Sequence, residues 1–208
     1  MLDNLSMPAA ANRLLAFFLP FCSATTLPDM TNFLNNLPQT LSPSPWLDQH
    51  MASIPHGGQV LDLACGSGRH TRLLVERGYP VLAVDRNAQA LAGLLGLAGV
   101  KTLELDLEGA DWPLAGQYFA GIVVTNYLWR PHLPDVLALL APGGVLIYET
   151  FMLGNEAFGK PSNPDFLLRS GELRRAAGVA GLREIAFMEG YLDSPKPAMV
   201  QAICARRD

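Results

Sequence analysis

The stretch VLDLACGSGRH places a carboxylate inside an apolar run and follows it at once with two glycines. Asp62 falls near the end of the expected strand, and Gly66 and Gly68 lie in the loop before a helix. Glycines allow a ligand to lie against the backbone, and a carboxylate at this position favours a ligand that carries a cation. The stretch therefore predicts a ligand site at the carboxyl end of a strand.

Two further acids end the next two apolar runs, Asp85 and Asp106. Ligands of open α/β sheets bind beyond the carboxyl ends of the strands, where these acids would meet Asp62. Asp85 is placed to accept hydrogen bonds from ribose hydroxyls, and Asp106 from the exocyclic amine of an adenine. A dinucleotide site would require a third glycine at Thr71 and would set a pyrophosphate against Asp62. The pattern therefore favours a ligand with an ammonium group and a ribose but no phosphate.

Each acid taken alone also has a structural interpretation. Asp62 could cap the following turn, Asp85 could cap the helix that begins near Asn87, and Asp106 could be a loop carboxylate. Their occurrence at three successive strand ends favours the ligand site over these alternatives.

The elements that position these acids follow an alternation of short apolar runs and helical patterns from Ser44 onward. We expect Ser44 to cap a first helix, Asn87 to cap a later one and Ser170 to cap the last. The expected strands are 59–64, 80–84, 100–105, 119–125, 144–151, 182–188 and 199–205. The first five are predicted to be parallel, and the last two to pair antiparallel across a loop of about nine residues.

The residues Asp62, Ala64, Gly66 and Gly68, followed by Asp85 and Asp106, resemble the cofactor site of class I S-adenosylmethionine-dependent methyltransferases. The resemblance runs from about Trp46 to the C-terminus. It implies an α/β fold with a Rossmann-like, seven-stranded, mostly parallel sheet, helices on both faces and an antiparallel final strand pair. It also implies S-adenosylmethionine as the cofactor. The chain departs from the family at Ala64, where glycine is frequent, and at Ala120 and Gly121, where an aspartate is common.

By this resemblance, Asp62 and the glycine loop hold the methionyl part, Asp85 holds the ribose, and Asp106 with Leu107 holds the adenine. The full set of expected cofactor contacts is Asp62, Ala64, Cys65, Gly66, Gly68, Asp85, Arg86, Asp106, Leu107 and Asn126.

The acceptor side is predicted from residues after the fourth and fifth strands. We expect Tyr127, Arg130 and Glu149 to line one cavity above the transferred methyl group, with Glu149 or Tyr127 as a base and His132 as a third candidate. Alternatively, Arg130 pairs with Glu149 or Glu156. The motif NPDF at 163–166 is interpreted as a turn.

The segments NYLWRP and IYETF resemble small bacterial methyltransferases grouped with the tellurite resistance methyltransferases. This resemblance implies in-line methyl transfer to a small molecule. Two alternatives stay open: methylation of RNA or protein, and a non-catalytic module that binds S-adenosylmethionine in support of a partner enzyme.

Composition limits the partners. The formal net charge is -4, and only three of the 15 basic residues are lysines, so no basic stripe predicts nucleic acid binding. Cys22, Cys65 and Cys204 are widely spaced, which argues against a disulfide framework and a zinc site and favours a cytoplasmic protein. His50, His56 and His70 lack metal-ligand spacing, so we expect no metal; His70 is expected at the surface, and Cys65 is expected as a small loop residue.

The amino-terminal part is expected to differ from the rest. The apolar run LLAFFLPF, 14–21, is too short to cross a bilayer and lacks a signal-peptide cleavage pattern. We therefore expect 1–43 to be a poorly ordered leader and linker, and 44–208 to be one methyltransferase domain. The sequence does not indicate which oligomeric state the protein adopts.

Overall fold

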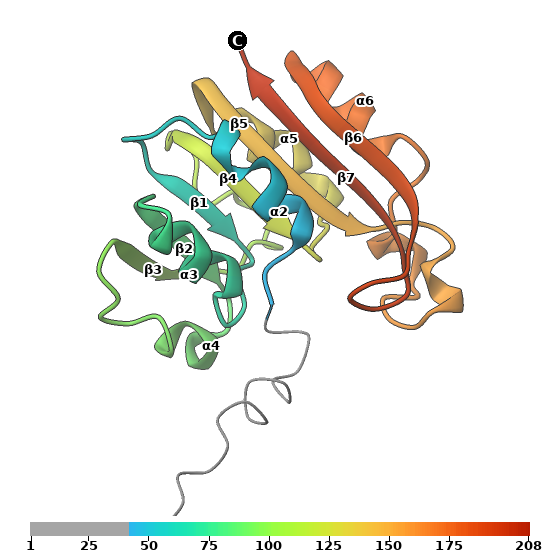
Figure 1. Cartoon of the computed structure of the whole chain (residues 1–208), viewed down its shortest axis with the longest axis horizontal. Coiled ribbons are helices and arrows are strands. Elements are labelled where there is room, and N and C mark those ends of the chain that lie inside the picture. The colour runs from blue at the N-terminus through green and yellow to red at the C-terminus, as the bar shows by residue number, and fades with distance from the viewer. Residues whose placement is uncertain (1–41) are drawn as a thin grey trace, which may run out of the picture. The chain divides into compact units, whose positions relative to one another are not determined.

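One seven-stranded sheet organises the computed structural model, which describes residues 42–208 (Figure 1). Almost all of the leader and linker expected at 1–43 therefore lies outside the described residues. The strands are β1 (Val60–Leu63), β2 (Val81–Asp85), β3 (Val100–Glu104), β4 (Phe119–Thr125), β5 (Leu140–Phe151), β6 (Leu182–Leu192) and β7 (Ala198–Arg207). Their order is β3-β2-β1-β4-β5-β7-β6, with β1 to β5 parallel and β7 antiparallel to both neighbours. The predicted Rossmann-like fold is confirmed.

Helices cover both faces of this sheet. The α-helices are α2 (Pro45–His50), α3 (Arg69–Glu76), α4 (Ala88–Ala92), α5 (Leu133–Ala138) and α6 (Glu172–Val179). Short 3-10 helices are η2 (Met51–Ser53), η3 (Arg130–His132), η4 (Asn155–Ala157) and η5 (Pro164–Phe166). In Figure 1, α2 and α3 lie in front of the sheet and α5 and α6 behind it. Among the described residues, every helix is too short or too polar to span a bilayer.

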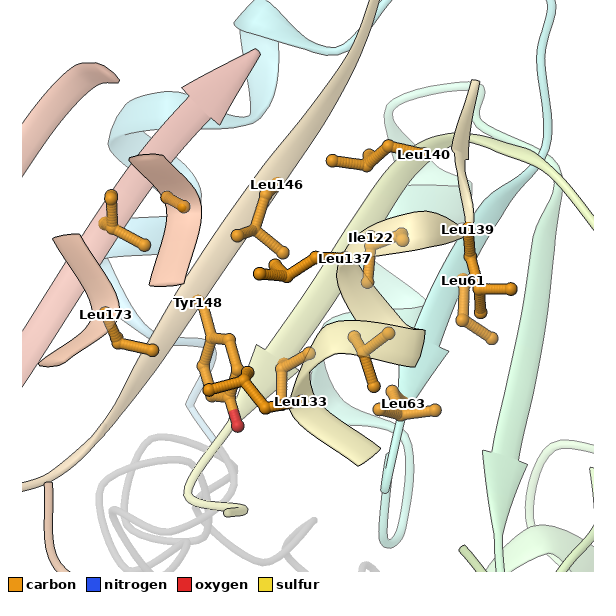
Figure 2. Packing of buried hydrophobic residues seen from close by; sticks show 14 of the residues in the cluster. Leu61, Leu63, Ile122, Leu133, Leu137, Leu139, Leu140, Leu146, Tyr148 and Leu173 are labelled. Atoms are coloured by element: carbon orange, nitrogen blue, oxygen red, sulfur yellow. The ribbon is translucent and has the colours of Figure 1, made fainter. Parts of the chain in front are cut away.

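The core explains how β1 presents its carboxylate. Leu61 and Leu63 pack with α5 and α6 in one buried cluster, which Figure 2 shows from close by. Val60 belongs to a second cluster with α2 and α3 on the opposite face. Successive side chains of a strand point to opposite faces, so Asp62 lies on the same face as Val60 and meets α3. The sheet therefore places a carboxylate inside an otherwise apolar layer.

Two of the three predicted helix caps are confirmed. The Ser44 hydroxyl accepts from Trp46 N at 3.1 Å, and Asn87 Oδ1 accepts from Ala90 N at 3.1 Å. The cap predicted at Ser170 is wrong: no side chain caps α6, and the Ser170 hydroxyl donates to Glu189 on β6 at 2.8 Å. Gly171, with a left-handed φ of 64°, begins α6 instead. The Glu189 carboxylate thus accepts a hydrogen bond from the hydroxyl that was predicted to cap the helix.

Near the start of β4, where the family commonly has a carboxylate, the pairing with β1 is regular, whereas the pairing with β5 shifts register between Phe119 and Gly121. β4 spans the predicted residues 119–125, and Gly121 pairs with Val60 of β1. A Cβ atom on Gly121 would lie 2.8 Å from a methyl carbon of Ile54. The small residue therefore lets the segment after α2 pack against the strand.

The final hairpin is longer than expected. β6 and β7 are paired from Leu182–Arg207 to Leu192–Ala198, which leaves only 193–197 as the connecting loop. The predicted antiparallel arrangement is confirmed, while the expected loop of about nine residues is too long. The alternating apolar pattern predicted a strand only to residue 188. In the structure, residues 189–192 also pair with β7.

Candidate active site

Asp62 is a buried carboxylate with one oxygen left without a partner. Its side chain is 1% exposed, and Thr71 Oγ1 on α3 donates to its Oδ2 at 2.6 Å. Its Oδ1 has no hydrogen-bond partner among the described residues. Burial raises the pKa of Asp62 to about 6, against the lowering effect of the Thr71 hydrogen bonds. A buried carboxylate oxygen without a hydrogen bond is unfavourable, so Oδ1 is a suitable acceptor for a donor from a ligand.

The loop after β1 turns sharply beside this carboxylate. Ala64, Gly66 and Gly68 all have positive φ, at 54°, 56° and 77°. A Cβ atom on Gly68 would lie 2.4 Å from a methyl carbon of Leu94, so this position requires glycine. Ala64 adopts a conformation that glycine takes more readily, which explains why glycine is frequent there in the family that the sequence resembles.

Asp85 connects the glycine loop to β2. Its Oδ2 accepts from Gly66 N at 2.7 Å and its Oδ1 accepts from Asn87 N at 2.9 Å. Each oxygen keeps a second lone pair, so the carboxylate can still accept from a ligand hydroxyl. Asp85 therefore orders the loop and remains available to a ligand.

A smaller cavity of about 150 Å³ lies at the carboxyl ends of β1, β2 and β3. Its lining includes five of the ten expected cofactor contacts: Ala64, Asp85, Arg86, Asp106 and Leu107. Tyr127 also lines it, and its buried hydroxyl has no hydrogen-bond partner among the described residues. Asp106 Oδ1 accepts from Glu108 N at 2.9 Å. The edge of the sheet thus brings together residues that are up to 63 positions apart.

These residues fit S-adenosylmethionine. Asp85 lines the smaller cavity and suits the ribose hydroxyls, whereas Asp62, whose unpartnered Oδ1 is expected to meet the methionyl ammonium group, is buried and lines neither cavity. Leu107 and Tyr127 line the smaller cavity together with Asp106, whose carboxylate could accept a hydrogen bond from an exocyclic amine. The individual residue roles stay predictions.

A larger cavity of about 490 Å³ adjoins the ends of β4 and β5. Asn126 and Glu149 line it from these two strand ends, and Arg69 lines it from α3. Asn126 N donates to the Glu149 carbonyl oxygen at 2.9 Å, which holds the two strand ends together. Asn126 adopts a left-handed φ of 55°, a strained conformation of the kind that accumulates at functional sites.

Glu149 is held by a short chain of polar contacts. The Ser44 hydroxyl donates to Glu149 Oε2, and Ser44 N donates to His70 Nε2 at 3.1 Å. His70 Nδ1 therefore carries the proton and donates to Thr125 Oγ1 at 3.0 Å. Burial raises the pKa of Glu149, while the Ser44 hydrogen bond and Arg69 act against this rise. A half-buried carboxylate with a raised pKa is a suitable proton acceptor.

His70 is not at the surface as the sequence predicted. It is 1% exposed, and burial lowers its pKa to about 3, so it is neutral at physiological pH. Its buried position results from α3 turning this face toward Ser44 and the end of β4. A neutral imidazole can accept from Ser44 and donate to Thr125 at the same time.

The three predicted catalytic residues do not share one cavity lining. Tyr127 lines the smaller cavity and Glu149 the larger one, while Arg130 lines neither. Arg130 Nε donates to Glu172 Oε1 at 2.6 Å, and its Nη2 donates to the Leu167 carbonyl oxygen at 2.6 Å. Arg130 thus pairs with an acid that the sequence did not suggest, and it connects η3 to α6. Its catalytic role stays a prediction.

His132, the third candidate base, and Cys65, an expected cofactor contact, both have structural surroundings. His132 Nδ1 contacts Asp135 Oδ2 at 2.8 Å, and its Nε2 contacts the Gly109 carbonyl oxygen at 2.7 Å. Neither cavity lining includes it. Cys65 is buried, and burial raises the pKa of its thiol well above the usual range, so it stays a thiol. Cys65 and Cys204 are both free, and no cluster in 42–208 has the composition of a metal site.

Sequence reasoning overlooked several residues of this region. Thr71 entered the sequence analysis only as the position where a dinucleotide site would require glycine. Its hydroxyl, three residues after Gly68, nevertheless reaches the carboxylate of Asp62. Ser44 was recognised as a cap but not as a partner of Glu149. Lys160 and Lys196 also line the larger cavity.

Comparisons with known proteins agree with this geometry. A family model described as "Methyltransferase domain" matches residues 60–144. Trans-aconitate 2-methyltransferase from Azoarcus sp. is 37% identical over 138 residues, which cover 61% of this chain and 50% of that protein. Protein-L-isoaspartate O-methyltransferase from Chlorobaculum tepidum is 34% identical over 131 residues, which cover 57% of this chain and 58% of that protein. The chain spans about half the length of the curated relatives it matches.

The sheet order, the strand-end acids and the family match agree on one class: residues 60–144 match a methyltransferase domain, and the sheet has the strand order of the class I S-adenosylmethionine-dependent methyltransferase fold. Among solved structures, its fold is similar to that of TehB from Haemophilus influenzae, with a TM-score of 0.62 and 22% identity. That similarity covers 78% of this chain and 61% of TehB. The predicted family and cofactor are confirmed.

Replacement of Asp85 by alanine is expected to weaken S-adenosylmethionine binding by about 1.5 to 3 kcal/mol, because hydrogen bonds to a charged acceptor are lost. The change also frees Gly66 N, so the glycine loop loses a contact. Calorimetry with S-adenosylhomocysteine measures the effect. Unchanged affinity in this variant would remove Asp85 from the ribose site.

Proposed function

We propose that the protein transfers the sulfonium methyl group of S-adenosylmethionine to a small molecule held in the larger cavity. The observation that carries this proposal is the position of Asn126 and Tyr127. These consecutive residues at the end of β4 line the larger and the smaller cavity respectively. A cofactor in the smaller cavity would therefore present its reactive end at the boundary of the larger one.

The size of the larger cavity supports a small acceptor. Pockets for small molecules and cofactors commonly measure roughly 300 to 1,000 Å³. The cavity of about 490 Å³ is within this range and has the apolar residues Phe151, Leu192 and Val200 in its lining. It could enclose a compact molecule and exclude water from the transfer.

When bound, the cofactor supplies an electrophilic methyl group on a sulfonium. We infer that Asp62 Oδ1 holds the ammonium group and Asp85 the ribose, so that the cofactor cannot shift along the sheet edge. Glu149 would then take a proton from the acceptor at its carboxylate, with Ser44 holding the group in place. Orientation at the strand ends would supply most of the rate.

Methyl-labelled S-adenosylmethionine incubated with the full-length protein and a cell extract tests the proposal. We expect label in the small-molecule fraction, identified by mass spectrometry, and none with heat-denatured protein. Label in RNA or protein would establish one of the alternative acceptors instead. Cofactor binding without transfer to any fraction would favour the non-catalytic module.

A further inference from the structure

The larger cavity contains an unusual share of the chain's lysines. The whole sequence has three lysines, at positions 101, 160 and 196. Lys160 and Lys196 both line this cavity, although they are separated by 36 positions and lie on different loops. Lys196 Nζ lies 3.8 Å from the position of a Cβ atom on Gly159. In a chain with a formal net charge of -4, two of three lysines thus converge on one cavity.

The two loops that carry these lysines are tied to each other and to the sheet. Asn155, which is 2% exposed, donates from Nδ2 to the Pro161 carbonyl oxygen at 3.0 Å. Its Oδ1 accepts from Met199 N on β7 at 3.2 Å. The rings of Phe158 and Tyr191 also pack with their centroids 5.3 Å apart. The backbone around both lysines is therefore held in place by contacts on either side of the cavity.

The acids on these loops have other partners. Glu156 Oε2 accepts from Gly154 N at 2.8 Å, and Asp193 Oδ1 accepts from the Tyr191 hydroxyl at 2.9 Å. Neither Lys160 nor Lys196 forms an ion pair with any residue of 42–208. Glu149 supplies the single carboxylate of the lining, and its charge interacts with that of Arg69. The cavity therefore carries an excess of positive charge.

We propose that the methyl acceptor carries a carboxylate or phosphate group that binds Lys160 and Lys196. This inference rests on the proposed function, because it assigns the substrate class of the same cavity. An anion that contacts both ammonium groups gains two charge-assisted hydrogen bonds. The positive charge also selects against neutral analogues, which would leave both cations without a counter-ion.

Calorimetry on the full-length protein loaded with S-adenosylhomocysteine tests this site, with succinate and inorganic phosphate as separate probes. The double variant Lys160→Gln/Lys196→Gln is expected to raise the dissociation constant of the probe that binds at least tenfold. Lys101→Gln is the matched control, because Lys101 is exposed on β3 and lies outside this lining. Its dissociation constant should stay within twofold of that of the unaltered protein.

The outcomes separate this inference from the proposed function. Equal affinity in the double variant, or no binding of either probe to the unaltered protein, would overturn the anion site. Stronger binding of succinate than of phosphate would identify a carboxylate acceptor, and the reverse order a phosphate. Failure of the protein to bind S-adenosylhomocysteine would contradict the proposed function, whereas lysine-dependent anion binding would then still be observed in the protein without cofactor.

Discussion

Replacement of Asp62 by asparagine is expected to weaken S-adenosylmethionine binding at least a hundredfold at pH 7.5. The ammonium group of the cofactor would lose its buried counter-charge, and breaking a buried ion pair costs about 3 to 5 kcal/mol. The asparagine oxygen can still accept from Thr71, so the local structure should persist. Calorimetry measures the affinity. Asp111→Asn, which changes an exposed acid without a hydrogen bond among the described contacts, is the control.

The same variant should be more stable than the unaltered protein when neither contains cofactor. Burial raises the pKa of Asp62 from 3.8 to about 6, so folding disfavours its charged form. Below pH 3.8 the carboxyl is protonated in both the folded and the unfolded chain, and its contribution to the free energy of unfolding is at its greatest. This contribution is lost as the pH rises through about 6, because the carboxyl then ionises inside the folded protein as well. At pH 7.5 asparagine removes this cost, and we expect a gain of about 1 to 3 kcal/mol in the free energy of unfolding. A lower free energy of unfolding in Asp62→Asn would show that the folded protein stabilises the charged carboxylate and that its burial carries no net cost.

Cofactor affinity should depend on pH through the same group. Below pH 6 the protein must release a proton from Asp62 before the ammonium group binds, so affinity should fall with decreasing pH. Above pH 6 it should be nearly constant, until the cofactor's own amine loses its proton. Asp62→Asn should show no such change between pH 5 and 7.

Replacement of Glu149 by glutamine is expected to reduce turnover at least tenfold while cofactor affinity stays almost unchanged. General base catalysis contributes roughly 10² to 10⁴ in rate, and glutamine has nearly the same shape without the basic carboxylate. Its side-chain oxygen can accept from the Ser44 hydroxyl, so the contact with the segment before α2 is kept. Steady-state kinetics on the acceptor found by methyl labelling measures the loss.

The pH profile distinguishes a base from a residue that only shapes the cavity. Burial raises the pKa of Glu149 above its ordinary value of 4.5, so kcat should fall as the pH decreases through this raised pKa. The glutamine variant should lose that acid limb, whereas Glu76→Gln, on the exposed end of α3, should retain it. Full activity of Glu149→Gln would exclude Glu149 from the mechanism, and a parallel loss of cofactor binding would place it in the cofactor site.

The cofactor side of the site followed from local patterns in the sequence. Asp62, Asp85 and Asp106 each end an apolar run, and parallel strands bring their carboxyl ends to one edge of a sheet. The smaller cavity contains two of these acids together with Ala64 and Leu107, as the pattern predicted. Strand periodicity and glycine placement suffice here, because each of these residues takes its position from its own strand or the loop directly after it.

The contacts around the larger cavity were visible only in the tertiary structure. The contact between Ser44 and Glu149 joins residues 105 positions apart, and the pairing of Arg130 with Glu172 joins residues 42 positions apart. Lys160 and Lys196 converge because of how two loops pack against β7. Periodicity determines which face of an element a side chain occupies, but the partner of a loop residue depends on the packing of segments that are distant in the sequence. The sequence by itself therefore predicted the strand-end acids that meet at the smaller cavity, and only the fold determined which charges line the larger cavity.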